Sequence, residues 1–161
     1  MTATSSFPYA KQAALELIAS DCAAIWSGDE AVVVRGAMTK QVPRASVSIY
    51  GTTSSDSEWT QQGAERREER YALDLQVEVV LPGDAVSDCE AKAFELWSVV
   101  EDRFRGDNQR EFLRTAMAAT PEARRHPLYN AECVLVDVVP VLWDKGSTCT
   151  LLGEIRITGR Q

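Results

Sequence analysis

The feature that most constrains this chain is the segment Glu65–Leu81, in which a block of mixed charge leads directly into an alternating strand. From residue 71 onward every second side chain is apolar. These apolar residues are Tyr71, Leu73, Leu75, Val77 and Val79, and between them lie Ala72, Asp74, Gln76 and Glu78. A strand with this period of two buries one face and leaves the other in water. The sequence therefore predicts a half-buried strand whose charged beginning extends beyond the core.

The charged beginning of this strand carries both signs. Its residues are Glu65, Arg66, Arg67, Glu68, Glu69 and Arg70. Mixed charges at the exposed end of a rigid strand suit a contact between identical subunits, although a solvated strand extension would carry the same residues. Residues 51–63 are polar, and we expect them to form a flexible loop that presents Trp59 either to its own subunit or to a neighbour. The candidate subunit interface therefore comprises Trp59 and residues 65–70.

Length and composition indicate one soluble globular domain over residues 1–161. Hydrophobic residues make up 45% of the chain and charged residues 25%, which are ordinary values for such a domain. The net charge of −7 argues against tight binding of nucleic-acid phosphates, although it leaves room for a local basic patch. The sequence shows neither a signal-peptide pattern nor an apolar run of about 18 residues, so we expect folding in a cytoplasm and no membrane partner.

The remaining pattern is that of an α+β protein. The expected elements are a helix over 9–27, strands over 31–35 and 46–50, the long strand, a helix over 86–105, a shorter helix within an insertion at 107–130, and strands over 131–143 and 148–158. The apolar stripe of the 86–105 helix matches the apolar face of the preceding strand, so the helix should pack on the sheet. We therefore expect a mixed, mainly antiparallel sheet, two principal helices packed against it and a C-terminal β-hairpin.

The register of the C-terminal hairpin follows from placing its turn at residues 144–147. This register sets Leu142 opposite Cys149, Val134 opposite Ile157 and Asp137 opposite Glu154. Pro140 lies inside the first strand of the hairpin and cannot donate a ladder hydrogen bond, so this strand should be bulged or lie at a sheet edge. An edge strand is also a place where a neighbouring subunit could add.

The residues that carry chemistry elsewhere are sparse in this chain. Cysteines stand at positions 22, 89, 133 and 149 without a C-x-x-C pair, and we expect reduced structural thiols in preference to a disulfide. His126 is the only histidine, which leaves a zinc site without ligands. Asp84, Glu90 and Lys92 resemble a metal-dependent nuclease pattern, but Glu90 and Lys92 fall on the expected helix instead of a strand. We therefore expect no catalytic, metal or cofactor site and no enzyme.

The order of these elements, together with three sequence strings, resembles a known family. The strings are Ala64–Leu75, Ala91–Glu101 and the final Gly153–Thr158. With an N-terminal helix and a tryptophan-bearing polar segment, they resemble the tail terminator (tail completion) proteins of long-tailed bacteriophages, the siphophages. The resemblance covers about residues 9–158, and the insertion at 107–130 departs from it by being longer than the family's usual link.

The resemblance implies a structural virion protein that assembles as a six-fold homo-oligomeric ring. Such a ring caps the finished tail tube, stops its polymerisation and docks to the head-completion proteins of the neck. The implied partners are the tail tube protein and a head-completion protein, and genome DNA passes through the lumen without specific binding. The implied location is the tail–neck junction of the virion, after assembly in the host cytoplasm. Two alternatives stay open, namely another neck component (a head-closure or connector protein) and a small stand-alone enzyme or binding domain.

Overall fold

A computed structural model describes residues 5–37, 43–59, 67–83 and 85–160, with the backbone alone described at 52–59 and 67. The helices are α1 (Phe7–Ala23), α2 (Val86–Asp102) and α3 (Gly106–Ala118), with single 3-10 turns η1 (Gly28–Glu30) and η2 (Ala123–Arg125). The strands are β1 (Val33–Arg35), β2 (Ala45–Trp59), β3 (Arg67–Pro82), β4 (Leu128–Trp143) and β5 (Gly146–Arg160). The predicted α+β class with a C-terminal hairpin is confirmed.

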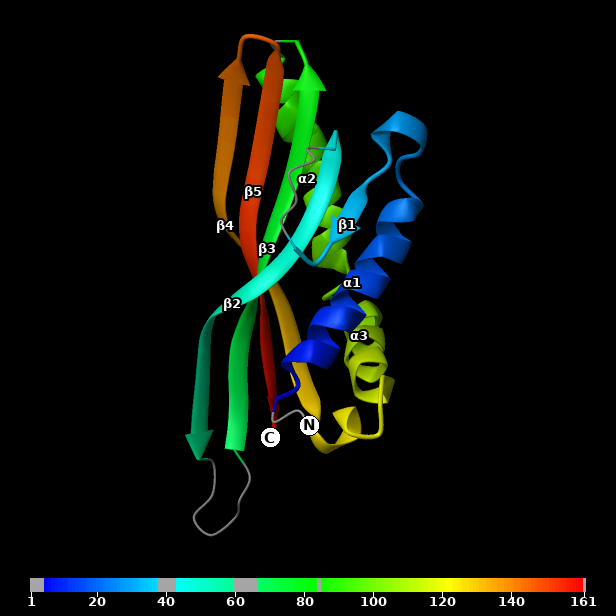
Figure 1. Cartoon of the computed structure of the whole chain (residues 1–161), viewed down its shortest axis with the longest axis vertical. Coiled ribbons are helices and arrows are strands. Elements are labelled where there is room, and N and C mark those ends of the chain that lie inside the picture. Colours follow the sequence, from blue (N-terminus) through cyan, green and yellow to red (C-terminus); the bar gives the residue numbers. More distant parts are fainter. Residues whose placement is uncertain (1–4, 38–42, 60–66, 84, 161) are drawn as a thin grey trace.

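One sheet organises the molecule, with the strand order β1-β2-β3-β5-β4 (Figure 1). β1 runs parallel to β2, and the other neighbours are antiparallel. The long strands β3 and β5 form its centre, and β4 lies at one edge, as the proline within it predicts. The helices cover one face of the sheet, and both ends of the chain lie at the same end of the molecule.

The core forms between the apolar face of the sheet and α2. The alternating residues of β3 from Tyr71 to Val79 are all buried, which confirms the predicted strand. The buried residues of α2 are Cys89, Ala93, Leu96, Trp97 and Val100, which lie on one face of a helix. Leu151, Ile155 and Ile157 of β5 complete this layer. Each large aliphatic side chain buried in this way contributes about 1.5–3 kcal/mol to folding.

The crossing of α2 over β5 depends on the missing side chain of Gly153. A β-carbon at this position would lie 2.5 Å from the carbonyl oxygen of Val134 and closer still to the indole ring of Trp97. The aromatic ring therefore occupies the space above the glycine, next to the point where the register of β4 against β5 shifts between Leu135 and Asp137.

We expect Gly153→Ala to lower the free energy of unfolding by about 1–3 kcal/mol, because the added methyl group overpacks this crossing. Urea denaturation measures the change. In a Trp97→Phe background the cost should shrink, because the smaller ring lacks the atoms that overlap the methyl group. An equal cost in both backgrounds would show that Trp97 does not require the glycine.

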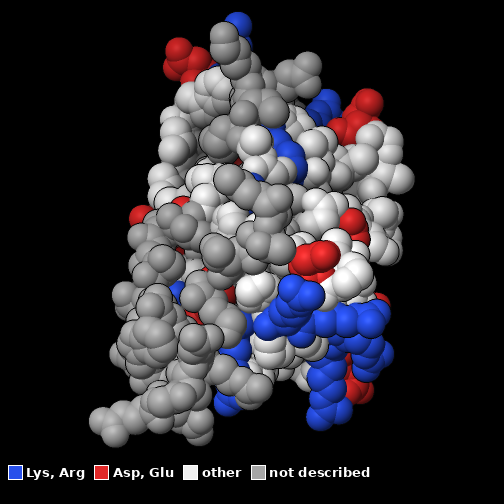
Figure 2. All heavy atoms as spheres, turned by 60° about the horizontal axis from the view of Figure 1, so that its bottom comes forward, with Lys and Arg blue, Asp and Glu red and all other residues white. Residues whose placement is uncertain are grey.

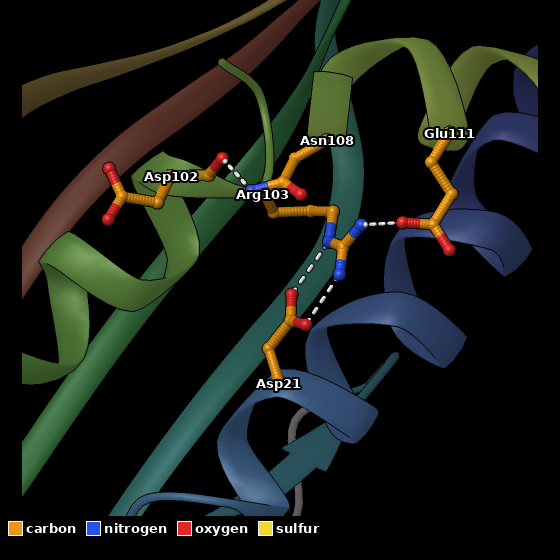
Figure 3. A network of polar contacts seen from close by, with 5 residues as sticks. All are labelled: Asp21, Asp102, Arg103, Asn108 and Glu111. Carbon is orange, nitrogen blue, oxygen red and sulfur yellow. Dashed lines mark hydrogen bonds and ion pairs between the residues drawn. The ribbon is translucent and has the colours of Figure 1, made fainter. Parts of the chain in front are cut away.

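A buried arginine joins the three helices (Figure 3). Arg103 follows α2, and its Nε and Nη2 atoms donate to the carboxylate of Asp21 on α1 at 2.6 and 2.5 Å. Its Nη1 atom donates to Glu111 on α3 at 2.6 Å. The hydrogen bond to Asp21 is the largest of the effects that hold the pKa of Arg103 above its usual range, so the guanidinium stays charged. Nearby, Asn108 donates to the carbonyl oxygen of Asp102 at 3.1 Å.

Two predicted boundaries are corrected. The predicted loop over 51–63 is wrong for residues 51–59, which continue β2 and pair with β3 as far as Trp59 opposite Arg67. Gly51 allows this continuation, because its φ of +62° accommodates the irregularity between Tyr50 and Thr52. The first helix ends at Ala23 instead of Ser27, and Gly28 begins the separate turn η1 that follows. Residues 60–63 of the predicted loop lie outside the described residues.

The predicted register of the C-terminal hairpin is also wrong. Leu142 faces Ser147 instead of Cys149, because two residues, Asp144 and Lys145, connect β4 and β5 where four were expected. The tighter turn also places Asp137 opposite Leu152, and a further shift between Leu135 and Asp137 places Val134 opposite Glu154. The expected repulsion between Asp137 and Glu154 therefore does not arise. The shorter helix expected within 107–130 is confirmed as α3.

The four cysteines are buried and reduced, as expected. Burial is the main reason that the pKa values of Cys22 and Cys133 rise from 9.0 to about 12. The unfolded chain therefore loses these thiol protons at lower pH than the folded chain. Between pH 9.0 and about 12, the folded chain binds more protons than the unfolded chain. Stability is unaffected by these groups below the unfolded value and falls as pH rises through the window.

We accordingly expect the free energy of unfolding to decrease between pH 9.0 and about 12, the interval set by the thiol pKa values. Denaturant titrations below and within this interval measure the decrease. A Cys22→Ala variant should lose less stability over the same interval, because it removes one of the titrating groups. The same pH dependence in the variant and the parent chain would contradict this assignment.

Candidate assembly surfaces

The most unusual surface of the molecule is the second half of β4. Here large apolar side chains are exposed on a sheet edge, whereas Leu128, Ala131 and Cys133 in the first half are buried. The exposed residues, with their exposed fractions, are Leu135 (36%), Val136 (60%), Val139 (38%), Val141 (47%), Leu142 (58%) and Trp143 (53%). We call this segment, residues 135–143, the β4 edge. A long apolar edge strand presents unpaired backbone groups and is a template for pairing with another chain.

Apolar residues occupy both faces of the β4 edge. Val139 and Val141 lie opposite Thr150 and Thr148 of β5, on one face, and Leu142 lies opposite Ser147, on the other. A strand that covers the core normally alternates apolar and polar residues, so apolar residues on both faces indicate that both are to be covered. The sequence signal for this surface is the run Val134–Trp143, which contains only one charged residue.

At the opposite edge of the sheet, the outermost strand β1 covers only part of β2. β1 pairs with β2 only at residues 46–48, whereas β2 extends to Trp59. Because β2, β3, β5 and β4 alternate in direction, β4 runs opposite to β2 (Figure 1). If two copies lie side by side with their sheets in the same orientation, β4 of one copy is therefore antiparallel to β2 of the other.

The predicted interface at the start of β3 divides into two parts. Glu69 is only 4% exposed, and its carboxylate accepts hydrogen bonds from the Ser5 hydroxyl and from the backbone nitrogen and hydroxyl of Ser6. The Ser6 hydroxyl also lies 2.9 Å from that of Tyr71. Glu69 therefore fixes the N-terminal segment of its own subunit and is not presented to a neighbour.

The other residues of that predicted interface are only partly described. Arg70 is exposed and forms an ion pair with Glu68 at 2.7 Å. Glu65 and Arg66 lie outside the described residues. Trp59 and Arg67 face each other in the β2–β3 ladder, and their side chains are not described. A contact between subunits through Glu68 and Arg70 stays a prediction.

A second surface, which the sequence pattern does not predict, lies at the end of the molecule where α1 begins and β5 ends. Exposed arginines gather there, and Figure 2 shows this basic area. Arg124 and Arg125 belong to η2, and Arg114 lies on α3, which packs against η2. Arg160 donates its backbone nitrogen to the carbonyl of Pro127, and its guanidinium lies 5.3 Å from the ring centre of exposed Tyr129. We call Arg114, Arg124, Arg125 and Arg160 the arginine end.

A groove between α1 and α3 adjoins the arginine end. Its volume is about 640 Å³. Its lining residues are Tyr9, Gln12, Ala13 and Glu16 of α1, with Arg114, Thr115, Ala118, Ala119 and Thr120 on the other side. The Thr120 hydroxyl accepts a hydrogen bond from the backbone nitrogen of Ala123, the first residue of η2. The groove therefore runs directly to the arginines of η2.

The residues considered for chemistry are not gathered into one site by the fold. Lys92 pairs with Glu30 at 3.4 Å and lies over the ring of Trp26, away from half-buried His126 beside η2. Asp84 lies outside the described residues. Among residues 5–37, 43–59, 67–83 and 85–160, no group of three or more metal-ligating side chains is found. None of the helices in these ranges is long and apolar enough to cross a bilayer.

Comparison with known proteins adds no family assignment. A scan against protein-family models finds no match to this chain. A search of curated proteins likewise finds no match. A functional proposal therefore rests on the surfaces described above and on the resemblance in the sequence.

Proposed function

We propose that this chain is a tail terminator of a long-tailed bacteriophage, a structural virion protein that forms a ring on the end of the tail tube. The observation that carries the proposal is the β4 edge, where six large apolar side chains remain exposed on an open strand. A monomer that kept this surface in water would be prone to uncontrolled pairing. A subunit of an assembly covers it with its neighbour.

The two edges of the sheet favour a head-to-tail contact. A cyclic ring uses heterologous interfaces, in which one surface of a subunit meets a different surface of the next. The β4 edge supplies one such surface, and the opposite edge of the sheet, where β1 and the second half of β2 lie, supplies the other. Their opposite directions permit antiparallel pairing from one subunit to the next. The resemblance to tail terminators supplies the six-fold number and the place on the tail tube.

In the virion, this ring would stop the tube from growing and present a face to the head-completion protein. The partners are other copies of the chain, the tail tube protein and the neck, and DNA passes through the central opening. The net charge of −7 supports such passage, because a generally acidic surface gains little from releasing phosphate counterions.

Electron microscopy and mass measurement of the purified chain test this proposal. We expect closed hexameric rings, and we expect tail tubes grown in the presence of the chain to end at a ring. Tubes of unchanged length distribution that carry no bound chain, together with a chain that is monomeric at every concentration, would overturn the proposal. Labelled antibody against the chain should mark the tail–neck junction of intact particles.

A further inference from the structure

We propose that the arginine end and the adjoining α1–α3 groove form a docking site for an acidic segment of a partner protein. An apolar side chain of that segment would enter the groove, and its carboxylates would meet Arg114, Arg124 and Arg125. The inference rests on the proposed function, because it assigns the face by which the ring meets the next component of the particle.

The first argument is the segregation of charge. The chain carries seven net negative charges, yet arginines concentrate at this end (Figure 2). Arg114, Arg124 and Arg125 form no ion pair with the described residues, whereas Arg103, Arg105 and Arg110 are all paired with carboxylates. The guanidinium groups of these three residues therefore stay available to a partner. Guanidinium binds carboxylates through two parallel hydrogen bonds, which gives both affinity and orientation.

The groove supplies the second argument, because it selects the class of partner. Ala13, Ala118, Ala119 and Tyr9 contribute apolar surface to its lining. Arg114 belongs to the lining, so a side chain in the groove has a cation beside it. Glu16 on the α1 side would repel carboxylates, so the acidic residues of the partner are directed toward η2. An aliphatic or aromatic side chain flanked by acidic residues satisfies these requirements.

A nucleic acid fits this surface less well than a protein. A DNA backbone offers phosphates for the arginines but no apolar group for the groove. The acidic remainder of the subunit would also repel a long polyanion, whereas it would repel a short acidic segment less. Arginine and tyrosine are among the residues enriched at protein–protein interfaces, and both lie at this end as Arg160 and Tyr129.

Fluorescence anisotropy with three labelled probes tests the inference. The first probe is a short peptide of Glu and Asp with a central Leu, the second replaces this Leu with Ser, and the third is a DNA duplex. We expect the full-length chain to bind the Leu peptide most tightly at about 0.15 M salt. Arg124→Gln with Arg125→Gln should weaken this binding at least about tenfold. Ala118→Trp, which fills the groove, should remove the preference for Leu over Ser.

A matched control removes two positive charges elsewhere. Lys92→Gln with Arg105→Gln should leave the affinity for the Leu peptide within about twofold of the parent chain, because these residues lie away from the groove. Undetectable binding of the Leu peptide, equal binding by the η2 variant, or tighter binding of the duplex would each overturn the docking site. Ring formation is measured on the same samples. Rings without peptide binding reject only the docking site, whereas peptide binding by a chain that neither forms rings nor binds tail tubes rejects only the proposed function.

Discussion

Replacing both Val136 and Leu142 with lysine will leave the subunit folded but unable to assemble. These side chains are 60% and 58% exposed, so their replacement does not disturb the core of the subunit. In the ring they would be covered by the neighbouring copy, where two unpaired ammonium groups would be desolvated. We expect association to weaken at least about a hundredfold, which corresponds to about 2.7 kcal/mol. Sedimentation velocity measures the association, and thermal denaturation reports the fold.

The control for this prediction adds the same charge to the helices. Ala23→Lys with Ala91→Lys places two lysines at exposed helical positions away from β4. This variant should form rings as the parent chain does, so that an effect of net charge alone is separated from an effect of the β4 edge. Normal rings from the Val136 and Leu142 variant would show that β4 is not part of the interface.

Arg103→Ala will destabilise the fold more than any other replacement of a charged residue considered above. The arginine side chain is 9% exposed and joins α1, α2 and α3 through Asp21 and Glu111. Removing one partner of a buried ion pair costs about 3–5 kcal/mol, because the opposite charge stays behind without compensation. Asp21 and Glu111 are 23% and 54% exposed and can recover some hydration, so we expect about 3 kcal/mol, the lower end of that range. Urea denaturation measures the change.

The neighbouring arginine provides a matched control. Arg105 is 63% exposed and pairs with Glu101 at 2.8 Å within the same turn of chain. Exposed pairs of this kind contribute at most a few tenths of a kcal/mol, so Arg105→Ala should be nearly neutral. The cost of Arg103→Ala should also fall in an Asp21→Asn background, because the uncompensated charge is then absent. A similar cost for both arginines would contradict a specific role for the buried one.

The periodicity of apolar residues was sufficient to predict those elements in which buried side chains recur at a regular spacing. The alternation from Tyr71 to Val79 specifies which face of β3 is buried, and the spacing from Cys89 to Val100 specifies the buried face of α2. Both predictions depend only on the periods of a strand and a helix. Pro140 predicted that β4 is bulged or lies at an edge, because proline cannot donate to a second neighbouring strand, and the strand lies at the edge.

Predictions from the sequence pattern were wrong where a segment far away in the sequence determines the structure. Residues 51–59 are polar and were predicted to be a loop, but β3 offers them a continuous antiparallel partner as far as Arg67. Glu69 was predicted to face a neighbouring subunit, yet the serines at residues 5 and 6 bind its carboxylate. The predicted hairpin register was wrong for a related reason, since a tighter turn moves every pair and two irregularities in β4 move some pairs again.

The candidate surfaces were visible in the sequence only as composition. The run Val134–Trp143 is apolar, but an apolar strand is equally suited to the centre of a sheet. Arg124 and Arg125 are adjacent in the sequence, but nothing there places Arg114 or Arg160 near them. Contacts between α3 and η2 and between Arg160 and Pro127 bring these residues to one end.

The class of the fold and the buried faces of its central strand and helix could be predicted from the sequence, because those follow from periodicity within a single element. Which apolar residues stay uncovered depends on how far the packed elements reach along one another. A helix rises about 1.5 Å per residue and a strand about 3.3 Å, so the 13 residues of α3 extend along less than half of the 16 residues of β4. α3 holds the first half through Gln109 and Ala131, α2 lies over β3 and β5, and the β4 edge is left open.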